Sequence, residues 1–319
     1  MKLNIQYEPI NKKHINPALD IVMSAYNEEK IAVPFLPDEL AHLDSIRESM
    51  SNLFNRGIGV AAISNNELIG FLAGFEIAEF FGKCKGVYSP LYGHGVIKRY
   101  RKSVYQELYK RAADLWTKKV CMTHAVTFFA HDSETIDNWF WQGFGLRCVD
   151  AIREVAAIYA SNSTFVICKA DADDIPGLAD IHRQHNLYYK NSPIFLPRNE
   201  EDPVQDLTEW LEHNNHHLWV AYHDQKPLGY MRIEPGAETF VSEHPTVMNI
   251  TGAYVLDNER RSGIGLMLLK TIQQWLLQNG YPLCGVDFES INTTGSNFWT
   301  KHFTPYTYSM VRRIDERII

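Results

Sequence analysis

The sequence predicts a mixed α/β (α+β) fold that occurs twice in tandem, each domain made of helices packed on a sheet. Three observations support this prediction. The length of 319 residues is enough for two domains. The chain resembles itself at a nearly constant step of 159 positions. Each repeat alternates short apolar strands with amphipathic helices, the pattern of a sheet covered by helices.

The internal repeat is the strongest of these observations. Sliding the chain by 159 positions superimposes residues of several unrelated types with almost no gaps. The matched pairs include Gly70 with Gly229, Val96 with Val255, Arg101 with Arg260, Trp116 with Trp275, and Phe144 with Phe303. A slip of one residue also aligns Phe35-Leu36-Pro37 with Phe195-Leu196-Pro197. We therefore expect two homologous domains, at residues 1–157 and 163–319.

The elements of the second repeat follow from hydrophobic spacing and from start and stop signals. Strands are expected at residues 165–169, 217–222, 228–233, 247–256, 283–289 and 306–314. Helices are expected after Asp173, from Asp202-Pro203 to His213, over residues 265–278, and over residues 295–302. Asn279-Gly280 is a typical end for the third of these helices.

Composition and charge exclude several classes of function. The 31 Lys and Arg residues and 38 Asp and Glu residues give a formal net charge of -7, which disfavours nucleic acid as the main partner. No segment is apolar enough to cross a membrane, and the N-terminus lacks an apolar signal region. Five scattered cysteines without a CxxC pair predict free thiols in a cytoplasmic protein.

The segment Arg260-Arg261-Ser262-Gly263-Ile264-Gly265 lies between an expected strand and an expected helix. A helix N-terminus presents unpaired N–H groups and a positive dipole end, which together bind anions such as a pyrophosphate. Glycine lets phosphates approach the backbone, and Arg260 and Arg261 add positive charge. A P-loop or a Rossmann loop would require glycines or a lysine that this segment lacks. The remaining interpretation is the coenzyme A loop R/Q-x-x-G-x-G/A, with Arg260, Gly263 and Gly265 at its fixed positions.

This loop and its surroundings resemble the Gcn5-related N-acetyltransferases, the GNAT superfamily. The loop is followed by a helix, a strand, Asn292 and a short aromatic helix, as in that family. The resemblance covers the whole second repeat and, more weakly, the first, and it implies a mixed, mostly antiparallel sheet in each domain. It also implies that backbone groups of Val255 and Leu256 contact the pantetheine arm of acetyl-CoA and that Asn292 binds near the thioester. The pyrophosphate would be held by the amides of Arg261, Ser262, Gly263, Ile264, Gly265 and Leu266. No metal is implied.

One family feature is missing from this sequence. The family often carries a tyrosine in the aromatic helix as the acid that protonates the leaving thiolate. Phe298 and Trp299 stand in that region, and neither can donate a phenolic proton. Tyr306, Tyr308 or water is an alternative donor, although tyrosines in strands more often serve packing.

Two carboxylates are candidates for the general base. Asp287 and Glu289 are two positions apart on one expected strand, so their side chains share a face. Crowding of two carboxylates would raise the pKa of one of them, as a base for an ammonium acceptor requires. The alternative is a solvent-facing edge or a salt bridge to Arg312 or Arg313. Tyr254 is a further candidate, on the strand that would lie beside the acetyl group.

The first repeat lacks these features. At a step of 159, Gly263 and Gly265 correspond to Val104 and Gln106, Asp287 to Phe128, and Glu289 to Ala130. We therefore expect one active domain, the second, and one degenerate domain.

The expected activity is transfer of acetyl from acetyl-CoA to a small primary amine by direct attack, in a monomer or homodimer. The alternative is a non-catalytic CoA-binding or regulatory protein on the same fold. The histidines at 213, 216 and 217 lack the spacing of a metal site, and Cys284 has no histidine partner that would make it a nucleophile. The sequence does not identify the acceptor.

Overall fold

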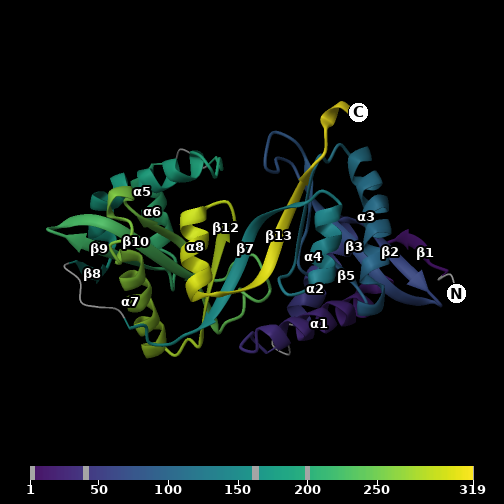
Figure 1. Cartoon of the computed structure of the whole chain (residues 1–319), viewed down its shortest axis with the longest axis horizontal. Helices are drawn as coiled ribbons and strands as arrows, with labels where there is room; N and C mark the ends of the chain where they lie inside the picture. Colours follow the sequence, from purple (N-terminus) through teal and green to yellow (C-terminus); the bar gives the residue numbers. More distant parts are fainter. Residues whose placement is uncertain (1–3, 39–42, 160–164, 198–201, 319) are drawn as a thin grey trace. The chain divides into compact units, whose positions relative to one another are not determined.

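The computed structural model describes residues 4–38, 43–159, 165–197 and 202–318 (Figure 1). The chain divides into two compact units. The first comprises Met1–Asp150 together with Pro305–Ile319, and the second comprises Ala151–Thr304. Each unit is a mixed sheet with helices, as the sequence predicts.

The first unit has the sheet order β1-β2-β3-β4-β6-β13, with β5 paired to β3. The pairing of β4 with β6 is parallel, and the other pairings described in this unit are antiparallel. Its strands are β1 (Gln6–Pro9), β2 (Ile58–Ser64), β3 (Glu67–Ile77), β4 (Gly86–Ser89), β5 (His94–Val96), β6 (Thr123–Phe129) and β13 (Thr304–Arg313). Its helices are α1 (Ile15–Ala32), α2 (Leu43–Arg56), α3 (Arg101–Lys118) and α4 (Ser133–Trp141).

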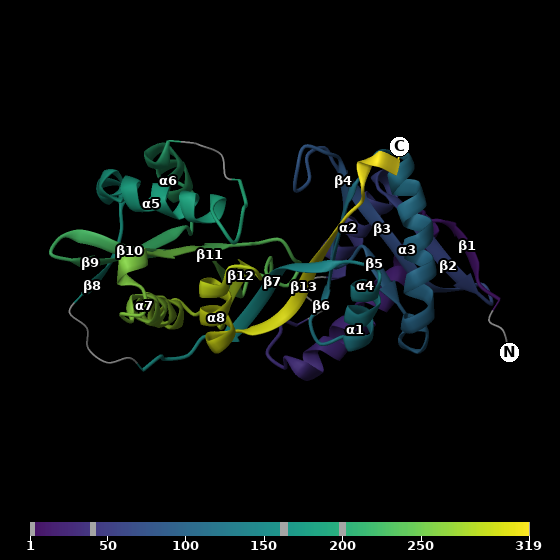
Figure 2. The same cartoon turned by 45° about the horizontal axis from the view of Figure 1, so that its top comes forward.

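The second unit repeats this plan with the sheet order β12-β11-β10-β9-β8. Its helices α5 and α6 lie on one face of the sheet and α7 and α8 on the other (Figure 2). The strands are β8 (Val166–Lys169), β9 (His217–His223), β10 (Lys226–Pro235), β11 (Val247–Val255) and β12 (Leu283–Glu289). The helices are α5 (Ile175–Lys190), α6 (Pro203–Leu211), α7 (Ile264–Gln278) and α8 (Thr293–His302). Every strand and helix expected in the second repeat is therefore present, with ends shifted by a few residues.

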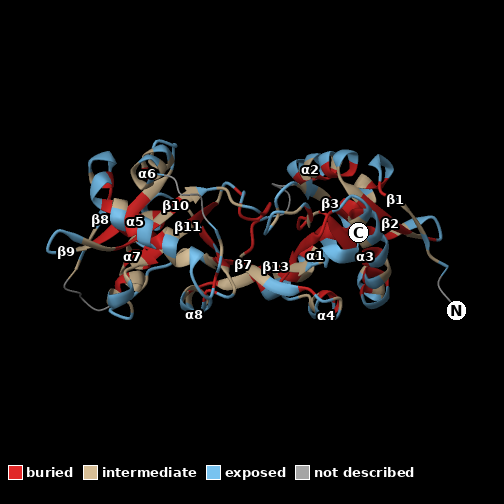
Figure 3. Cartoon of the chain, turned by 90° about the horizontal axis from the view of Figure 1, so that it is seen from above, coloured by how far each residue is buried: buried red, intermediate tan, exposed pale blue. Residues whose placement is uncertain are grey.

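Local sequence signals explain where these helices begin and end. Asp202 caps α6 by accepting a hydrogen bond from the Val204 amide, and Pro203 occupies the first helical position, where no N–H is needed. Helix α7 ends at Asn279, and Gly280 follows with φ +76°. Buried residues lie along the strands and the inner sides of the helices of each unit (Figure 3).

The last strand of the chain completes the sheet of the first unit. Strand β13 runs antiparallel to β6, with Thr307 opposite Phe129, and the Ala130 amide donates to the Tyr306 carbonyl at 2.9 Å. Strand β7 (Gly145–Glu154) begins in the first unit and ends in the second, where it lies beside β12 and the Val155 amide donates to the Pro282 carbonyl at 2.8 Å. The compact units therefore differ from the sequence repeats 1–157 and 163–319 in their final strands. Residue 163 lies outside the described residues.

Candidate active site

Strands β11 and β12 separate after a short parallel pairing. Only Val247–Ile250 pair with Leu283–Val286, whereas β10 pairs with β11 as far as Val255. Within the described sheet, one edge of β11 beyond Ile250 thus has no neighbouring strand, and its backbone groups can bind an extended ligand. Val255 and Leu256, predicted to contact pantetheine, lie where this edge ends.

The segment between β11 and α7 forms a loop that leaves the start of the helix open. After a 3-10 turn at Asp257–Glu259, Arg261 and Gly263 adopt left-handed conformations with φ of 66° and 93°. Gly263 is the N-cap of α7, and because it has no side chain it does not cap the helix with a hydrogen bond. The amides of Ile264, Gly265 and Leu266 therefore have no intrahelical acceptor, and the dipole of α7 makes this end positive. Such an arrangement binds an anion.

The two loop glycines have different reasons to be glycine. Position 263 requires glycine because few other residues adopt φ +93°. Lack of space is not the reason, since no heavy atom lies within 4 Å of the position that a Cβ would take. A Cβ on Gly265 would lie 3.5 Å from the ring of Phe298, an ordinary contact. The surrounding chain thus demands glycine at position 263 but tolerates a small side chain at position 265.

The two loop arginines also differ. The Arg260 guanidinium folds back on its own chain, where Nε donates to the Val255 carbonyl at 3.2 Å and the head group pairs with Asp257 at 2.5 Å. Arg261 is exposed and forms no ion pair with any residue that the structure describes. Arg261 is therefore the arginine available to a phosphate, and Arg260 supports the loop.

The side chain of Ser262 is also engaged within the loop. Its hydroxyl donates to the Glu259 carbonyl at 2.5 Å, which closes the turn before the helix. The contribution of Ser262 to a bound anion would therefore come from its backbone amide.

The predicted base candidates lie on both sides of the gap between β11 and β12. Asp287 is exposed and Glu289 half-buried on β12, and their alternation with buried Val286 and Phe288 confirms that they share a face. Tyr254, on β11, is 7% exposed and stacks on His185 with ring centroids 5.3 Å apart. Burial raises the pKa of Tyr254, which keeps its hydroxyl protonated at neutral pH.

Asn292 lies at the N-terminus of α8, and its Oδ1 atom is fully used. This atom accepts hydrogen bonds from the Gly295 amide at 3.1 Å and from the Tyr188 hydroxyl at 2.8 Å. The Nδ2 atom forms no hydrogen bond with the described residues and remains available to a ligand. Sequence reasoning missed Tyr188, and the only signal was the pair Tyr188-Tyr189 in the last turn of α5.

The aromatic helix α8 holds no phenol beside the loop. Trp299 is buried, and Phe298 lies next to Gly265. The alternative donors Tyr306 and Tyr308 are on β13, which belongs to the first unit rather than to the unit that holds the loop.

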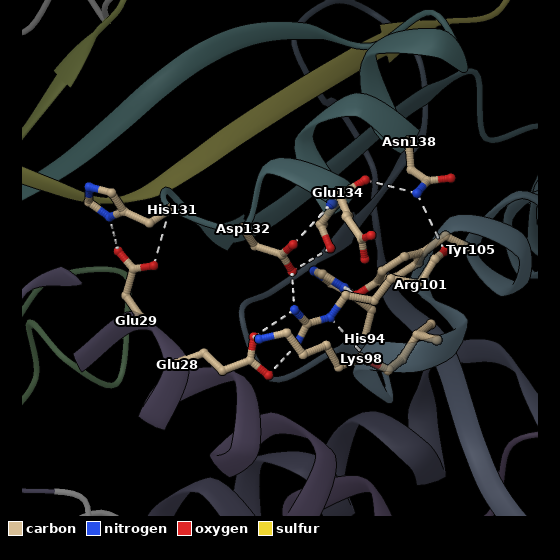
Figure 4. A network of polar contacts seen from close by, with 12 residues as sticks. Glu28, Glu29, His94, Lys98, Arg101, Tyr105, His131, Asp132, Glu134 and Asn138 are labelled. Carbon is tan, nitrogen blue, oxygen red and sulfur yellow. Dashed lines mark hydrogen bonds and ion pairs between the residues drawn. The ribbon is translucent and has the colours of Figure 1, made fainter. Parts of the chain in front are cut away.

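The corresponding loop of the first unit is absent because its residues are helical. Helix α3 begins at Arg101, the position of Arg260, and Val104 at the position of Gly263 is buried within the helix. Arg101 keeps the bond to its strand, with Nε donating to the Val96 carbonyl at 3.3 Å. Its guanidinium also binds both carboxylate oxygens of Glu28, at 2.8 and 3.1 Å, and pairs with Asp132 at 3.3 Å (Figure 4).

The gap between the strands of the first unit is filled by a histidine. His94 Nε2 donates to the Thr127 carbonyl of β6 at 2.8 Å, and Nδ1 lies 3.0 Å from the Tyr105 hydroxyl. Burial lowers the pKa of His94 to about 4, so the imidazole is neutral at pH 7. Side chains of the first unit thus occupy the place that is open in the second.

The structure corrects one part of the comparison between repeats. Strands β6 and β12 are both seven residues long, and the capping residues Asp132 and Asn292 each follow three positions later. The step is therefore 160 here, and Asp287 and Glu289 correspond to Thr127 and Phe129 rather than to Phe128 and Ala130. The first unit still has no carboxylate at either position.

In the described part of the chain, no group of three or more His, Cys, Asp or Glu side chains is arranged to hold a metal ion. The five cysteines are free, as predicted, and no helix among the described residues is long and apolar enough to cross a membrane.

Comparison with known proteins adds the family. Residues 181–303 match the acetyltransferase (GNAT) family. This part of the chain is a GNAT domain. Its match includes the gap between β11 and β12, the loop and α8, and it confirms the resemblance that the sequence suggested.

The fold of the whole chain is that of tandem GNAT proteins. A tandem GNAT protein from the clavulanic acid biosynthesis pathway has a TM-score of 0.51, with 12% identity over 97% of this chain and 98% of that chain. A GCN5-related N-acetyltransferase from Sphaerobacter thermophilus has a TM-score of 0.61, with 11% identity over 97% of this chain and 95% of that chain. No curated protein sequence matches. The two GNAT-like units thus share a fold, and they differ in whether the loop is open.

Proposed function

We propose that the second unit transfers an acetyl group from acetyl-CoA to a small primary amine, and that the first unit does not bind CoA. The observation that carries the proposal is the uncapped start of α7, because it is open in the unit that matches the family. The amides from Arg261 to Leu266 and the Arg261 side chain would bind the pyrophosphate. Val255, Leu256 and the Nδ2 atom of Asn292 would bind the pantetheine arm.

Direct attack of the amine on the thioester fits the residues present. The Val255 N–H group would stabilise the oxyanion, because the Leu256 amide already donates to the Leu228 carbonyl at 2.9 Å. Glu289, assisted by Asp287 or Tyr254, would take a proton from the ammonium group. A covalent enzyme intermediate on Cys284 is disfavoured, because burial raises the pKa of this thiol to about 12 and leaves it protonated. The net charge of -7 is compatible with a cationic acceptor in the cytoplasm.

A non-catalytic CoA-binding or regulatory role is the second candidate. The observation that favours it is Phe298, which leaves α8 without a phenolic proton donor. The two candidates differ in whether free CoA appears. A screen for thiol release from acetyl-CoA with polyamines, amino acids, peptides and aminoglycosides separates them, because only the acetyltransferase releases thiol.

The loop is tested by Gly263→Val, which copies Val104 of the first unit. Valine at φ +93° forces the loop out of its conformation, so the affinity for acetyl-CoA measured by calorimetry should be lost. Gly280→Val is the matched control, because Gly280 also has a positive φ, of 76°, with open space around it, at the other end of α7. Unchanged affinity in Gly263→Val would refute the assignment of the loop.

A further inference from the structure

The GNAT domain contains a buried chain of hydrogen bonds that joins α6, α5 and β10. Asp206 on α6 lies 2.6 Å from Nε2 of His182 on α5. Nδ1 of His182 lies 2.9 Å from the hydroxyl of Tyr230 on β10, and the same hydroxyl lies 2.6 Å from Nδ1 of His185. The two histidines and Tyr230 are each at most 3% exposed, whereas the side chain of Asp206 is 35% exposed. The chain thus runs from a buried imidazole to a carboxylate that reaches solvent.

The donors and acceptors in this chain fix the tautomer of each neutral imidazole. Nε2 of His182 must carry a proton, because it faces the carboxylate of Asp206. Nδ1 of His182 then accepts the single proton of the Tyr230 hydroxyl. The Tyr230 oxygen is left to accept from His185, so Nδ1 of His185 carries a proton and Nε2 is its basic atom.

The same four side chains can also hold one more proton with all their hydrogen bonds formed. When Nε2 of His185 takes up a proton, its Nδ1 proton passes to Tyr230 and the Tyr230 proton passes to Nδ1 of His182. The two hydrogen bonds at the Tyr230 hydroxyl are kept with their directions reversed. The bond from His182 Nε2 to Asp206 keeps its direction, and the positive charge ends on His182 beside this carboxylate. The carboxylate at 2.6 Å and the N-terminal turn of α6, where Asp206 lies, are a favourable environment for this ion pair.

The inner end of the chain lies beneath the candidate active site. His185 stacks on Tyr254, and the Arg260 guanidinium lies 5.6 Å from the centre of the same Tyr254 ring. Among the described contacts of this end, Tyr188 and Tyr189 on α5 are further titratable side chains. The first unit has none of the chain, because α1 carries Val22 and Ala25 at the positions of the two histidines and β3 carries Phe71 in place of Tyr230.

We infer that Asp206, His182, Tyr230 and His185 form a proton relay that serves acetyl transfer. An ammonium acceptor loses two protons on its way to the amide, and the leaving thiolate takes one back. The relay accepts one of these protons at His185 and stores it as the His182 imidazolium, while a carboxylate such as Glu289 takes the other. The part concerning transfer rests on the proposed function, whereas the coupled change of two histidines is a property of the folded chain alone.

The coupling is tested by nitrogen NMR of the histidine side chains in the full-length protein. On lowering the pH, His185 should change from its Nδ1–H to its Nε2–H tautomer at the same midpoint at which His182 becomes an imidazolium. In Tyr230→Phe the two histidines should titrate independently. Phe71 shows that the fold accepts phenylalanine at the corresponding position. Tyr222→Phe is the control, because it removes a hydroxyl that bonds only to Asp174, at 3.5 Å, and lies outside the relay. Two separate midpoints in the native protein, or His185 in its Nε2–H form at high pH, would overturn the relay.

The role in transfer is tested by kinetics with any amine that gives thiol release. Tyr230→Phe should lower kcat roughly 100-fold with unchanged calorimetric affinity for acetyl-CoA, while Tyr222→Phe keeps the native kcat. An unaltered kcat in Tyr230→Phe would refute the role in transfer. Failure of the proposed function is distinguishable, because native protein would then release no thiol with any amine although the two histidines still titrate together.

Discussion

The Arg260 guanidinium lies over the ring of Tyr188, 4.5 Å from its centre, where Arg101 of the first unit binds Glu28 instead. Tyr188 and Glu28 are both the fourteenth residue of their helices, α5 and α1, so the two units have different side chains at one position. In the first unit the arginine is neutralised by carboxylates of the protein itself. In the second it pairs with the single carboxylate of Asp257, which is 72% exposed, and otherwise contacts a neutral ring, so it keeps more of its positive field for a ligand.

This difference predicts the effect of placing the acid of the first unit in the second. Tyr188→Glu should lower the affinity for acetyl-CoA at least about tenfold, because it neutralises Arg260 and repels the phosphates. Tyr188→Phe keeps the ring beside Arg260 and loses only the hydroxyl that donates to Asn292, so its affinity should fall less than that of Tyr188→Glu. Calorimetry on both variants is the measurement. Equal affinities of native protein and Tyr188→Glu would show that the ligand phosphates do not approach Arg260.

The position of Glu289 predicts a change in the pH dependence of the rate. Glu289→Gln removes the proposed proton acceptor, so kcat/KM should fall roughly 100-fold and its rise with pH should flatten. Asp224→Asn, an equivalent change in the turn between β9 and β10, should leave the profile as it is. A native profile in Glu289→Gln would remove this residue as a base and leave Asp287 and Tyr254.

The helices and strands of the second unit and its loop could be predicted from the sequence, because both depend on local signals. Gly263 could be recognised from its place before a helix, and its φ of 93° explains why glycine stands there. The relay could not be recognised, because Asp206, His182 and Tyr230 meet only when α5 and α6 pack on β10. The two histidines at 182 and 185 share a helix face, but this spacing alone does not separate a relay from core packing.

The exchange of the final strands β7 and β13 between the two sheets could not be predicted from the sequence either. The repeat shows that β7 and β13 are equivalent, and it does not show which sheet each of them joins. Both sheets offer the same kind of edge to a strand of the same pattern. The choice is made by tertiary contacts, such as those of Met310 on β13, which is buried in the hydrophobic core of the first unit.

The neutral His94 predicts that the protein loses stability in mild acid. Burial holds the pKa of His94 near 4 in the folded chain, whereas an unfolded chain takes up a proton below about pH 6.5. The free energy of unfolding should therefore decrease by roughly 3 kcal/mol as the pH falls from 6.5 towards 4. Above pH 6.5 this histidine causes no loss of stability. Urea unfolding between pH 7 and pH 4 measures this loss.

The matched variant for this measurement is His94→Gln. A glutamine amide can donate to the Thr127 carbonyl and accept from Tyr105, and it does not titrate. The variant should be less stable than native protein at pH 7 and show a smaller decrease on acidification. An equal decrease in both proteins would place the acid sensitivity elsewhere, for example at His124, whose pKa burial also lowers to about 4.

The strand exchange predicts that the two sequence repeats depend on each other. Fragments 1–157 and 163–319 should form a one-to-one complex when they are produced together, because β13 of the second fragment completes the sheet at β6 of the first. Size-exclusion chromatography with mass determination measures the complex. Ending the second fragment at Phe303 removes β13 and should weaken the association without abolishing it, because β7 of the first fragment still lies beside β12. Hydrogen exchange of the β6 amides should rise in the shortened pair, since these amides lose their partners across the sheet. Two full-length fragments that remain separate, or β6 amides whose exchange is unchanged without β13, would mean that β13 is not what completes the first sheet.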